Sequence, residues 1–458
     1  MGETLWISPE DRLQAAGAKA YRPDATKAGA RRPPPLPLDC THELHRPTSM
    51  TRSDGLHLLP GITDIEATQW DALLDASATA VPPCLRHAYL ATLEDTGCVG
   101  GRTGWTPAHA TLWQQGELTA AMPLYLKDHS YGEYVFDWAW AEAYHRHGLD
   151  YYPKWLSALP FTPIPGPRLL GRDLRARRAL LDAVLAQVRA SGCASFHVLF
   201  PAADELPLLA SAGMMIREGV QFHWQDPPPS AICHAPVSPL ATDLNMNGQR
   251  ARWTDFDAFL ASLNSEKRKK IRQERRRAAA HGLALRWLDG HDTQAEDWDF
   301  LARCYATTYT LHRATPYLSP TFFHRLGERM PGSVRLLLAS RHGERIAAAF
   351  FLCDEHALYG RYWGALENLP FLHFELCYYQ AIEYCIAHGL ERFEGGAQGE
   401  HKLARGLRPV RTYSAHWIAD PRFRRAVDDY LARERNGMDG YVDELHERSP
   451  FRRSTQEG

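Results

Sequence analysis

The segment 395–402 reads GGAQGEHK and combines glycines with an acid, a histidine and a lysine. Backbone N–H groups can converge on a phosphate or an oxyanion where glycines cluster, and a lysine adds positive charge. We therefore expect an anion to be held by Gly395, Gly396, Gly399 and Lys402. Glu400 or His401 could take a proton from an attacking amine. The alternative is a tight turn with a salt-bridged rim. The spacing differs from that of a Walker loop.

The segment 359–364 reads YGRYWG and places an arginine among aromatic residues in an expected strand. Arg361 could bind a carboxylate or phosphate through two parallel hydrogen bonds, with Tyr362 and Trp363 beside it as substrate contacts. The alternative is a half-buried strand with a stacked arginine. Downstream, His373 and Glu375 open an expected helix two residues apart, so they do not share a face. Either one could act as a base or cap the helix.

Acids and aromatic residues alternate between residues 131 and 155. Carboxylates next to aromatic rings can bind an amine through charge and cation–π contact. We therefore expect an acceptor-binding surface at Tyr131, Glu133, Tyr134, Asp137 and Trp138. The alternative is a packed loop.

The segment Lys267–Arg277 holds eight Lys or Arg in eleven residues, with Glu274 as its only acid. On a helix, this run could attract the phosphates of tRNA or of a lipid headgroup. A solvated helix is the alternative, and no recognised RNA-binding module accompanies the run.

The composition limits the class of protein. The 458 residues include 52 Lys and Arg against 54 Asp and Glu, which excludes a globally basic protein that coats nucleic acid. The 9 cysteines are scattered without a CxxC pair, so we expect reduced thiols rather than a disulfide framework or a structural zinc site. No metal site is expected, because no HExxH motif occurs. The sequence has no apolar run of about 18 residues and no secretory signal, so we expect a cytoplasmic protein without a membrane span.

Alternating helical and strand patterns follow an N-terminal stretch that lacks them. We expect residues 1–49 to be a disordered extension and the Pro-rich residues 227–250 to be a connector. The remaining divisions are a first module at 50–226, a second at 251–440 and a flexible tail at 441–458. Helices are expected at 172–191, 256–281 and 374–388, among others, and strands at 118–126, 345–354 and 357–363.

Short motifs recur in the same order in both modules, which indicates an internal repeat. The matched pairs are 116–118 with 343–345, 131–134 with 359–362, 195–197 with 392–394, and 221–224 with 414–417. The repeat predicts an α/β (α+β) protein of two similar units with a cleft between them, where ligands are commonly bound.

The range 55–435 resembles the FemAB-like group of N-acyltransferases, whose members are tandem modules of the GNAT acyltransferase fold. The resemblance is carried by the segments Ser130–Trp140, Tyr151–Pro167, Lys267–Arg277, Tyr359–Gly364, Leu372–Gln380 and Gly395–Lys402. It implies two GNAT-like modules with mixed, mainly antiparallel sheets flanked by helices. Fem-type relatives transfer amino acids from aminoacyl-tRNA to peptidoglycan precursors, whereas ordinary GNAT enzymes use acyl-CoA.

The resemblance has one departure. GNAT enzymes bind the CoA pyrophosphate with a [QR]xxGx[GA] turn, but residues 367–374 here read ENLPFLHF without glycine. This favours aminoacyl-tRNA or another activated donor over acyl-CoA.

These features together predict an N-acyltransferase that holds no tightly bound cofactor and uses acyl-CoA or aminoacyl-tRNA as a donor substrate. The acceptor is an amine on a small molecule or peptide. His401 or Glu400 is the expected base, with Glu375 and His373 as further candidates, and proximity alone could supply much of the rate. The alternative is a degenerate GNAT pair that binds a peptide or cell-wall precursor without chemistry.

Overall fold

The computed structural model describes residues 52–77, 79–226, 252–311, 313–396 and 399–452. The expected extension at 1–49 and connector at 227–250 lie outside these residues. Within the described residues, no helix is both long and apolar enough to cross a membrane.

The first half of the chain forms short helices and strands around one long amphipathic helix, α5. Its helices are α2 (Ala67–Asp75), α3 (His87–Asp95), α4 (Trp138–Arg146), α5 (Leu174–Ala190) and α6 (Leu206–Ser211). Its strands are β1 (Gly55–Leu59), β2 (Trp105–Pro107), β3 (His109–Gln114), β4 (Glu117–Met122), β5 (Tyr125–Lys127), β6 (Lys154–Ser157), β7 (Leu170–Gly171), β8 (Ser195–Leu199) and β9 (Met215–Gln225).

The second half repeats this plan with longer strands. Its helices are α7 (Phe256–Ser262), α8 (Ser265–Ala279), α9 (Ala295–Leu311), α10 (Pro320–Arg329), α11 (Leu372–Phe374), the π-helical turn η5 (Glu375–Tyr379), α12 (Gln380–His388), the 3-10 helix η6 (Glu400–Arg405) and α13 (Pro421–Glu447). Its strands are β10 (Leu283–Asp289), β11 (Val334–Arg341), β12 (Glu344–Cys353), β13 (Ala357–Ala365), β14 (Arg392–Glu394) and β15 (Arg408–Ile418).

The strand pairing confirms the expected fold class of repeated α/β units with mixed, mainly antiparallel sheets. A four-stranded sheet has the order β1-β3-β4-β7, and an eleven-stranded sheet has the order β10-β11-β12-β13-β14-β9-β15-β8-β6-β5-β2. The parallel pair β13 and β14 corresponds to the parallel pair β6 and β8. The helix between the two strands, α5 in one half and α11 to α12 in the other, supplies the crossover that a parallel pair requires.

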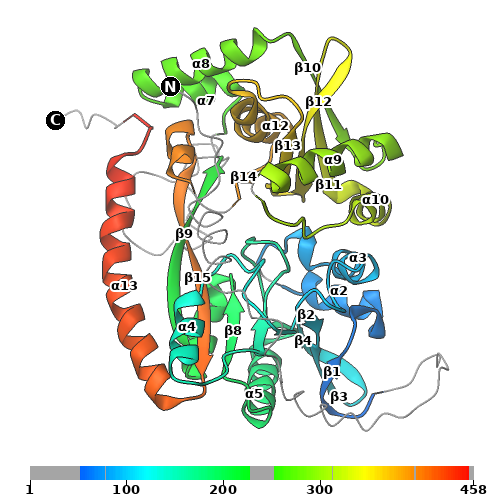
Figure 1. The fold of residues 1–458 in the computed structure, drawn as a ribbon, viewed down its shortest axis with the longest axis vertical. Helices are drawn as coiled ribbons and strands as arrows, with labels where there is room; N and C mark the ends of the chain where they lie inside the picture. The colour runs from blue at the N-terminus through cyan, green and yellow to red at the C-terminus, as the bar shows by residue number, and fades with distance from the viewer. Residues whose placement is uncertain (1–51, 78, 227–251, 312, 397–398, 453–458) are drawn as a thin grey trace, which may run out of the picture.

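The two halves exchange their last strands. β9 from the first half lies between β14 and β15 of the second, and β15 in turn pairs with β8 of the first. The large sheet therefore runs continuously through both modules (Figure 1). One hydrophobic cluster likewise combines residues from both halves, including Trp70, Leu90, Phe322 and Phe350.

One of the four motif matches behind the repeat is wrong. Residues 359–362 lie in β13, but residues 131–134 form a loop, and the counterpart of β13 is β6 (Lys154–Ser157). Tyr-Gly-x-Tyr recurs here without a shared structural role. The other three matches fall on equivalent turns and strands.

Three expected segments differ in the structure. The helix expected at 256–281 is broken, because Leu263 is extended and the Asn264 side chain accepts a hydrogen bond from the Lys267 N–H and caps α8. The strand expected at 118–126 stops at Met122 and resumes at Tyr125. The expected flexible tail is wrong for 441–447, because α13 continues to Glu447 and buries Val442 and Leu445.

Candidate functional site

The pairing of β13 with β14 ends early, and the chain leaves the sheet there. The two strands pair from Ala357 with Arg392 to Tyr359 with Glu394, after which β13 continues to Ala365 beside β12. The chain after β14 turns away at Gly396, which has a φ of 78° that suits glycine, and then enters η6. The end of β13, the start of α11 and η6 thus form the borders of one region, which we call the β13/β14 divergence.

An aromatic and histidine cluster fills the β13/β14 divergence. The His373 ring lies against Trp363, with their centroids 4.4 Å apart, and against Tyr378, with centroids 5.4 Å apart. The Tyr378 hydroxyl and His401 Nε2 share a hydrogen bond of 3.0 Å. Three predicted site residues, His373, His401 and Trp363, are thereby brought together from three different elements.

Both histidines of this cluster are held neutral. Burial lowers the pKa of His373 to about 3, and the neighbouring His401, Arg405 and Lys402 add to the effect. Burial also lowers the pKa of His401 to about 4, helped by Lys402 and Arg405. At neutral pH each ring is therefore uncharged and can accept a hydrogen bond through its free nitrogen.

The turn beside the cluster depends on glycine. Gly399 has a φ of 113°, and a Cβ there would lie 2.5 Å from Cε1 of His401. Gly395 is also restricted, because its Cβ would lie 2.9 Å from Leu407. Buried Lys402 donates to the Gly396 carbonyl over 3.0 Å. The glycines thus place the His401 ring. Ala397 and Gln398 lie outside the described residues, so an anion cradle here stays a prediction.

Arg361 and Tyr362 reach from β13 to the first half of the chain. The Arg361 guanidinium donates to the Phe161 carbonyl and, over 3.4 Å, to Thr162 Oγ1. Tyr362 donates to the same Phe161 carbonyl over 3.1 Å. Arg361 Nε is buried and has no hydrogen-bond partner among the described residues. The predicted binding of an anion by Arg361 therefore stays a prediction.

The predicted acceptor-binding loop adjoins this contact. The Gly132 carbonyl accepts from the Phe161 N–H over 3.1 Å, so the loop and Arg361 share one anchor residue. Tyr131 and Trp138 lie with ring centroids 4.9 Å apart, and both are half-buried. Tyr134 lies in the same loop with a φ of 63°.

The two acids of this loop are engaged by a lysine. Glu133 and Asp137 are buried and accept from Lys154 Nζ over 2.8 Å and 2.5 Å. Burial raises the pKa of Glu133 to about 7. Burial alone would raise the pKa of Asp137 as well, but the Lys154 ammonium holds it well below its usual value. The structure thus places these carboxylates in an internal ion-pair network, where Lys154 already neutralises the charge predicted to attract an amine.

The predicted acidic bases lie apart from the histidine cluster. Glu400 is exposed and accepts from Tyr441 of α13 over 3.0 Å and from Arg448, the residue that follows α13, over 2.8 Å. Glu375 is buried and accepts from Arg275 of α8 and from Gln380. Both carboxylates are therefore paired with side chains that hold helices in place.

Sequence reasoning missed two members of the cluster, Tyr378 and Arg405. The Arg405 guanidinium lies 3.4 Å from the centroid of the Phe374 ring and pairs with the buried Glu274 of α8 over 3.0 Å. Glu274 also accepts from the Tyr379 hydroxyl. The sequence did contain a signal for this contact. Glu274 is spaced with Ile271 and Ala278 on the buried face of an otherwise cationic helix, and a buried acid needs a partner such as Arg405.

Among the described residues, no group of three or more His, Cys, Asp or Glu side chains is placed to hold a metal ion. The basic run forms most of α8, and its outer face is cationic.

A family model described as FemAB-like, peptidoglycan biosynthesis/recognition, matches residues 61–229 and 240–453. This match confirms the family inferred from the sequence segments. No curated protein sequence matches the chain.

Three solved structures are among those similar to this chain. FemX is 12% identical, with 80% of this chain and 98% of that chain covered and a TM-score of 0.48. A tandem GNAT protein from the clavulanic acid biosynthesis pathway is 14% identical, with 80% and 99% covered and a TM-score of 0.40. L-PGS from Bacillus licheniformis is 9% identical, with 81% and 96% covered and a TM-score of 0.44.

Proposed function

The chain belongs to the FemAB-like family of peptidoglycan biosynthesis/recognition proteins, and from this membership we propose that it is an N-acyltransferase. It transfers an acyl or aminoacyl group from an activated donor to an amine of a peptide or cell-wall precursor.

One observation supports this proposal most directly. Neutral His401, hydrogen-bonded to Tyr378, lies where the pairing of β13 with β14 ends, beside the cations Lys402 and Arg405. Amide formation needs a proton acceptor for the amine and positive charge for the carbonyl oxygen. The presence of an uncharged histidine and two cations in one cluster supports this assignment.

The proposed reaction is direct acyl transfer. The acceptor nitrogen attacks the donor carbonyl carbon and forms the C–N bond, and the nitrogen proton passes to His401. The C–O or C–S bond of the donor then breaks, and the leaving alcohol or thiol takes that proton. His401, with a pKa of about 4, is a weak base, so it takes the proton from the tetrahedral intermediate, whose attached ammonium group is more acidic than a free alkylammonium ion. Bound geometry supplies the remaining rate.

The donor is proposed to be an aminoacyl-tRNA, with acyl-CoA as the competing candidate. The turn before α11 contains Phe371 at a φ of 67° where a glycine-rich turn would hold a pyrophosphate. Arg277 of α8 lies over the Phe371 ring, with 5.6 Å between guanidinium carbon and centroid. One cation of the basic helix thus lies beside the turn that precedes α11.

Donor assays with mass-spectrometric detection test the proposal. The full chain is incubated with a peptide amine acceptor and either acetyl-CoA, a longer acyl-CoA or charged tRNA, and the acceptor mass is measured. An acyl or aminoacyl mass increase that depends on His401 supports transfer. If every donor leaves the acceptor unchanged while the acceptor binds, the chain is a non-catalytic binding module.

The tRNA arm has its own test. Binding of charged tRNA should weaken steeply as salt rises, because phosphate contacts release counterions. Reversing the charge of Lys269, Lys270 and Arg272 should weaken it further. If neither the salt concentration nor these substitutions changed the affinity for tRNA, α8 would be excluded as a tRNA contact.

A further inference from the structure

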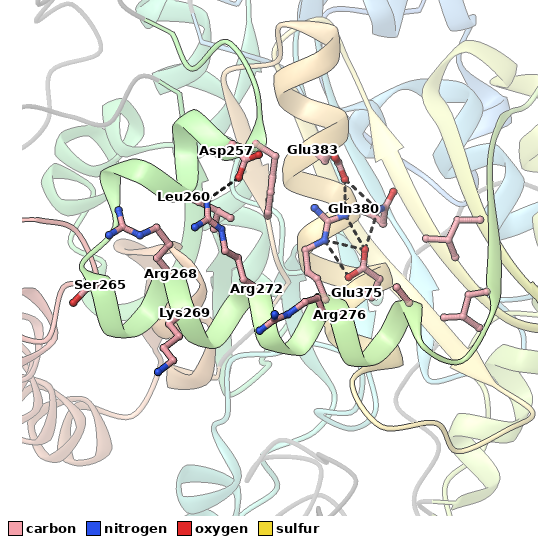
Figure 2. A pocket seen from close by; sticks show the side chains of 15 residues that line it. Asp257, Leu260, Ser265, Arg268, Lys269, Arg272, Arg276, Glu375, Gln380 and Glu383 are labelled. Atoms are coloured by element: carbon pink, nitrogen blue, oxygen red, sulfur yellow. Dashed lines mark hydrogen bonds and ion pairs between the residues drawn. The ribbon is translucent and has the colours of Figure 1, made fainter.

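A groove of about 840 Å³ lies along α8, between this helix, α7, α12 and β10 (Figure 2). Among the described residues that line it, none is His373, Tyr378 or His401. The groove is therefore a different place from the β13/β14 divergence, although Glu375 of the π-helical turn forms part of its inner end.

The cations on this groove divide into paired and unpaired groups. Arg272 pairs with Asp257 over 3.0 Å, and Arg275 is engaged by Glu375 over 3.0 Å and by Glu383 over 2.7 Å. Arg268, Lys269 and Arg276 line the same groove, and none of them pairs with a carboxylate among the described residues. The groove thus has a net positive rim with three available cationic side chains, and Figure 2 shows Arg268, Lys269 and Arg276 at separate positions along α8.

The floor of the groove is apolar. It is formed by Leu260 and Phe256 of α7 and by the half-buried Leu283 and Leu285 of β10. The inner end is closed by Gln380, which donates to Glu375 and Glu383 over 3.0 Å and 3.1 Å. A ligand would therefore place negative charge at the rim and apolar atoms on the floor.

We propose that this groove is a second ligand site that takes a phosphate-bearing molecule with an apolar portion. Guanidinium groups bind phosphate oxygens through paired hydrogen bonds. Insertion of α8 into a membrane is not favoured, because the exposed large apolar side chains among the described residues, Leu149, Leu174, Leu311, Leu366 and Tyr430, all lie outside α7 and α8. The proposal does not depend on the transferase reaction.

Calorimetric titration of the full chain tests the site with two probes. Inorganic pyrophosphate represents a free phosphate, and dihexanoyl phosphatidic acid below its micelle concentration represents a headgroup attached to apolar chains. The groove variant is Lys269→Gln with Arg276→Gln. The matched control, Lys270→Gln with Arg277→Gln, removes the same two residue types from the same helix outside the groove. Circular dichroism checks that both variants fold.

The site would be supported by saturable one-to-one binding whose affinity falls at least tenfold in the groove variant. The affinity should fall less than twofold in the control. The probe that binds more tightly then identifies the source of the phosphate. Because the groove has an apolar floor, we expect the lipid probe to bind more tightly. Equal weakening in both variants would mean that only the overall charge of α8 attracts anions, and the site would be rejected. Lack of saturable binding by either probe would also reject it.

Discussion

At the scale of single residues, Glu400 and His401 show how neighbours in the sequence can have different roles. Both lie in the 3-10 helix η6, where successive side chains point about 120° apart. Glu400 therefore turns outward to Tyr441 of α13 and to Arg448 just after it, whereas His401 turns inward to Tyr378. The proton-acceptor role is consistent with the second environment only.

The first prediction compares these two residues. His401→Ala should lower kcat by about 10²-fold, the usual contribution of a positioned base. Glu400→Ala should leave kcat within about twofold, because the Glu400 carboxylate points away from His401 and its exposed ion pair with Arg448 is screened by water. Acceptor mass increase over time measures both. The reverse pattern would assign the proton transfer to Glu400.

The second prediction concerns pH. Because burial, Lys402 and Arg405 lower the pKa of His401 to about 4, its neutral form persists well below the ordinary histidine value of 6.5. The ratio of wild-type kcat to His401→Ala kcat, in which the protonation of the acceptor amine cancels, should therefore hold as pH falls through 6.5 and decline only near pH 4. Far-ultraviolet circular dichroism at each pH separates this decline from unfolding. An acid limb between pH 6 and 7 would contradict a buried His401 as the base.

The same two histidines make folding depend on pH in a defined direction. The folded-state pKa of His373, about 3, and of His401, about 4, lie below the unfolded value near 6.5. The unfolded chain therefore binds more protons across this window. The stability that these residues contribute is present above pH 6.5 and is lost as pH falls toward 4 and below.

At the scale of elements, the site depends on a helix with a π-helical turn and on a glycine loop facing it. The turn Glu375–Tyr379 interrupts the helix between α11 and α12, and such turns are frequent at functional sites. Glu274 of α8 contacts both borders of the site, through Tyr379 on the π-helical turn and Arg405 on η6. The basic helix is thereby attached to both.

The third prediction concerns the glycine loop. Gly399→Ala should lower the unfolding free energy by about 1–3 kcal/mol, because alanine rarely adopts a φ of 113° and its Cβ would displace the His401 ring. The same substitution should lower kcat and leave KM nearly unchanged. Urea denaturation and acceptor-mass kinetics measure the two effects.

The matched control for this variant is Gly437→Ala in the middle of α13. A Cβ there has nothing within 4 Å, so the substitution should stabilise the protein by about 0.5–1 kcal/mol through helix propensity. If Gly399→Ala proved equally harmless, the placement of His401 by this loop would be wrong.

At the scale of the whole molecule, the exchange of β9 and β15 decides how the two halves behave. β9 pairs with β15 over nine residue pairs, from Met215 with His416 to His223 with Arg408, and with β14 over three. Without the second half, β9 would therefore lack both of its neighbouring strands. Without the first half, the same would hold for β15. An unpaired strand in the middle of a sheet exposes both backbone edges.

The fourth prediction follows from this exchange. A fragment of residues 52–226 should lack a cooperative urea transition, whereas the full chain should unfold with both halves together. Co-expression of 52–226 with 252–452 should restore a soluble complex, because the exchanged strands are then supplied. Circular dichroism and size-exclusion chromatography measure these outcomes. A cooperatively folded, monomeric 52–226 fragment would show that the first half is an independent domain.

The sequence by itself predicted the repeat, most helices and strands and the family, and it named His373, Trp363 and His401 among its candidate site residues. These follow from local periodicity, from glycine at turns and from motif segments, all of which are encoded within short stretches of chain. It also indicated the cationic helix, because the charge run Lys267–Arg277 needs no partner to be recognised.

Tertiary structure alone decided which polar groups are already paired. Lys154 lies between Glu133 and Asp137, and Arg448 reaches Glu400, across separations of seventeen to forty-eight residues that no local pattern encodes. The exchange of β9 and β15 is likewise hidden, because a strand's sequence specifies which faces it buries but not which neighbour supplies its hydrogen bonds. The chemistry available to each predicted residue depends on those long-range contacts.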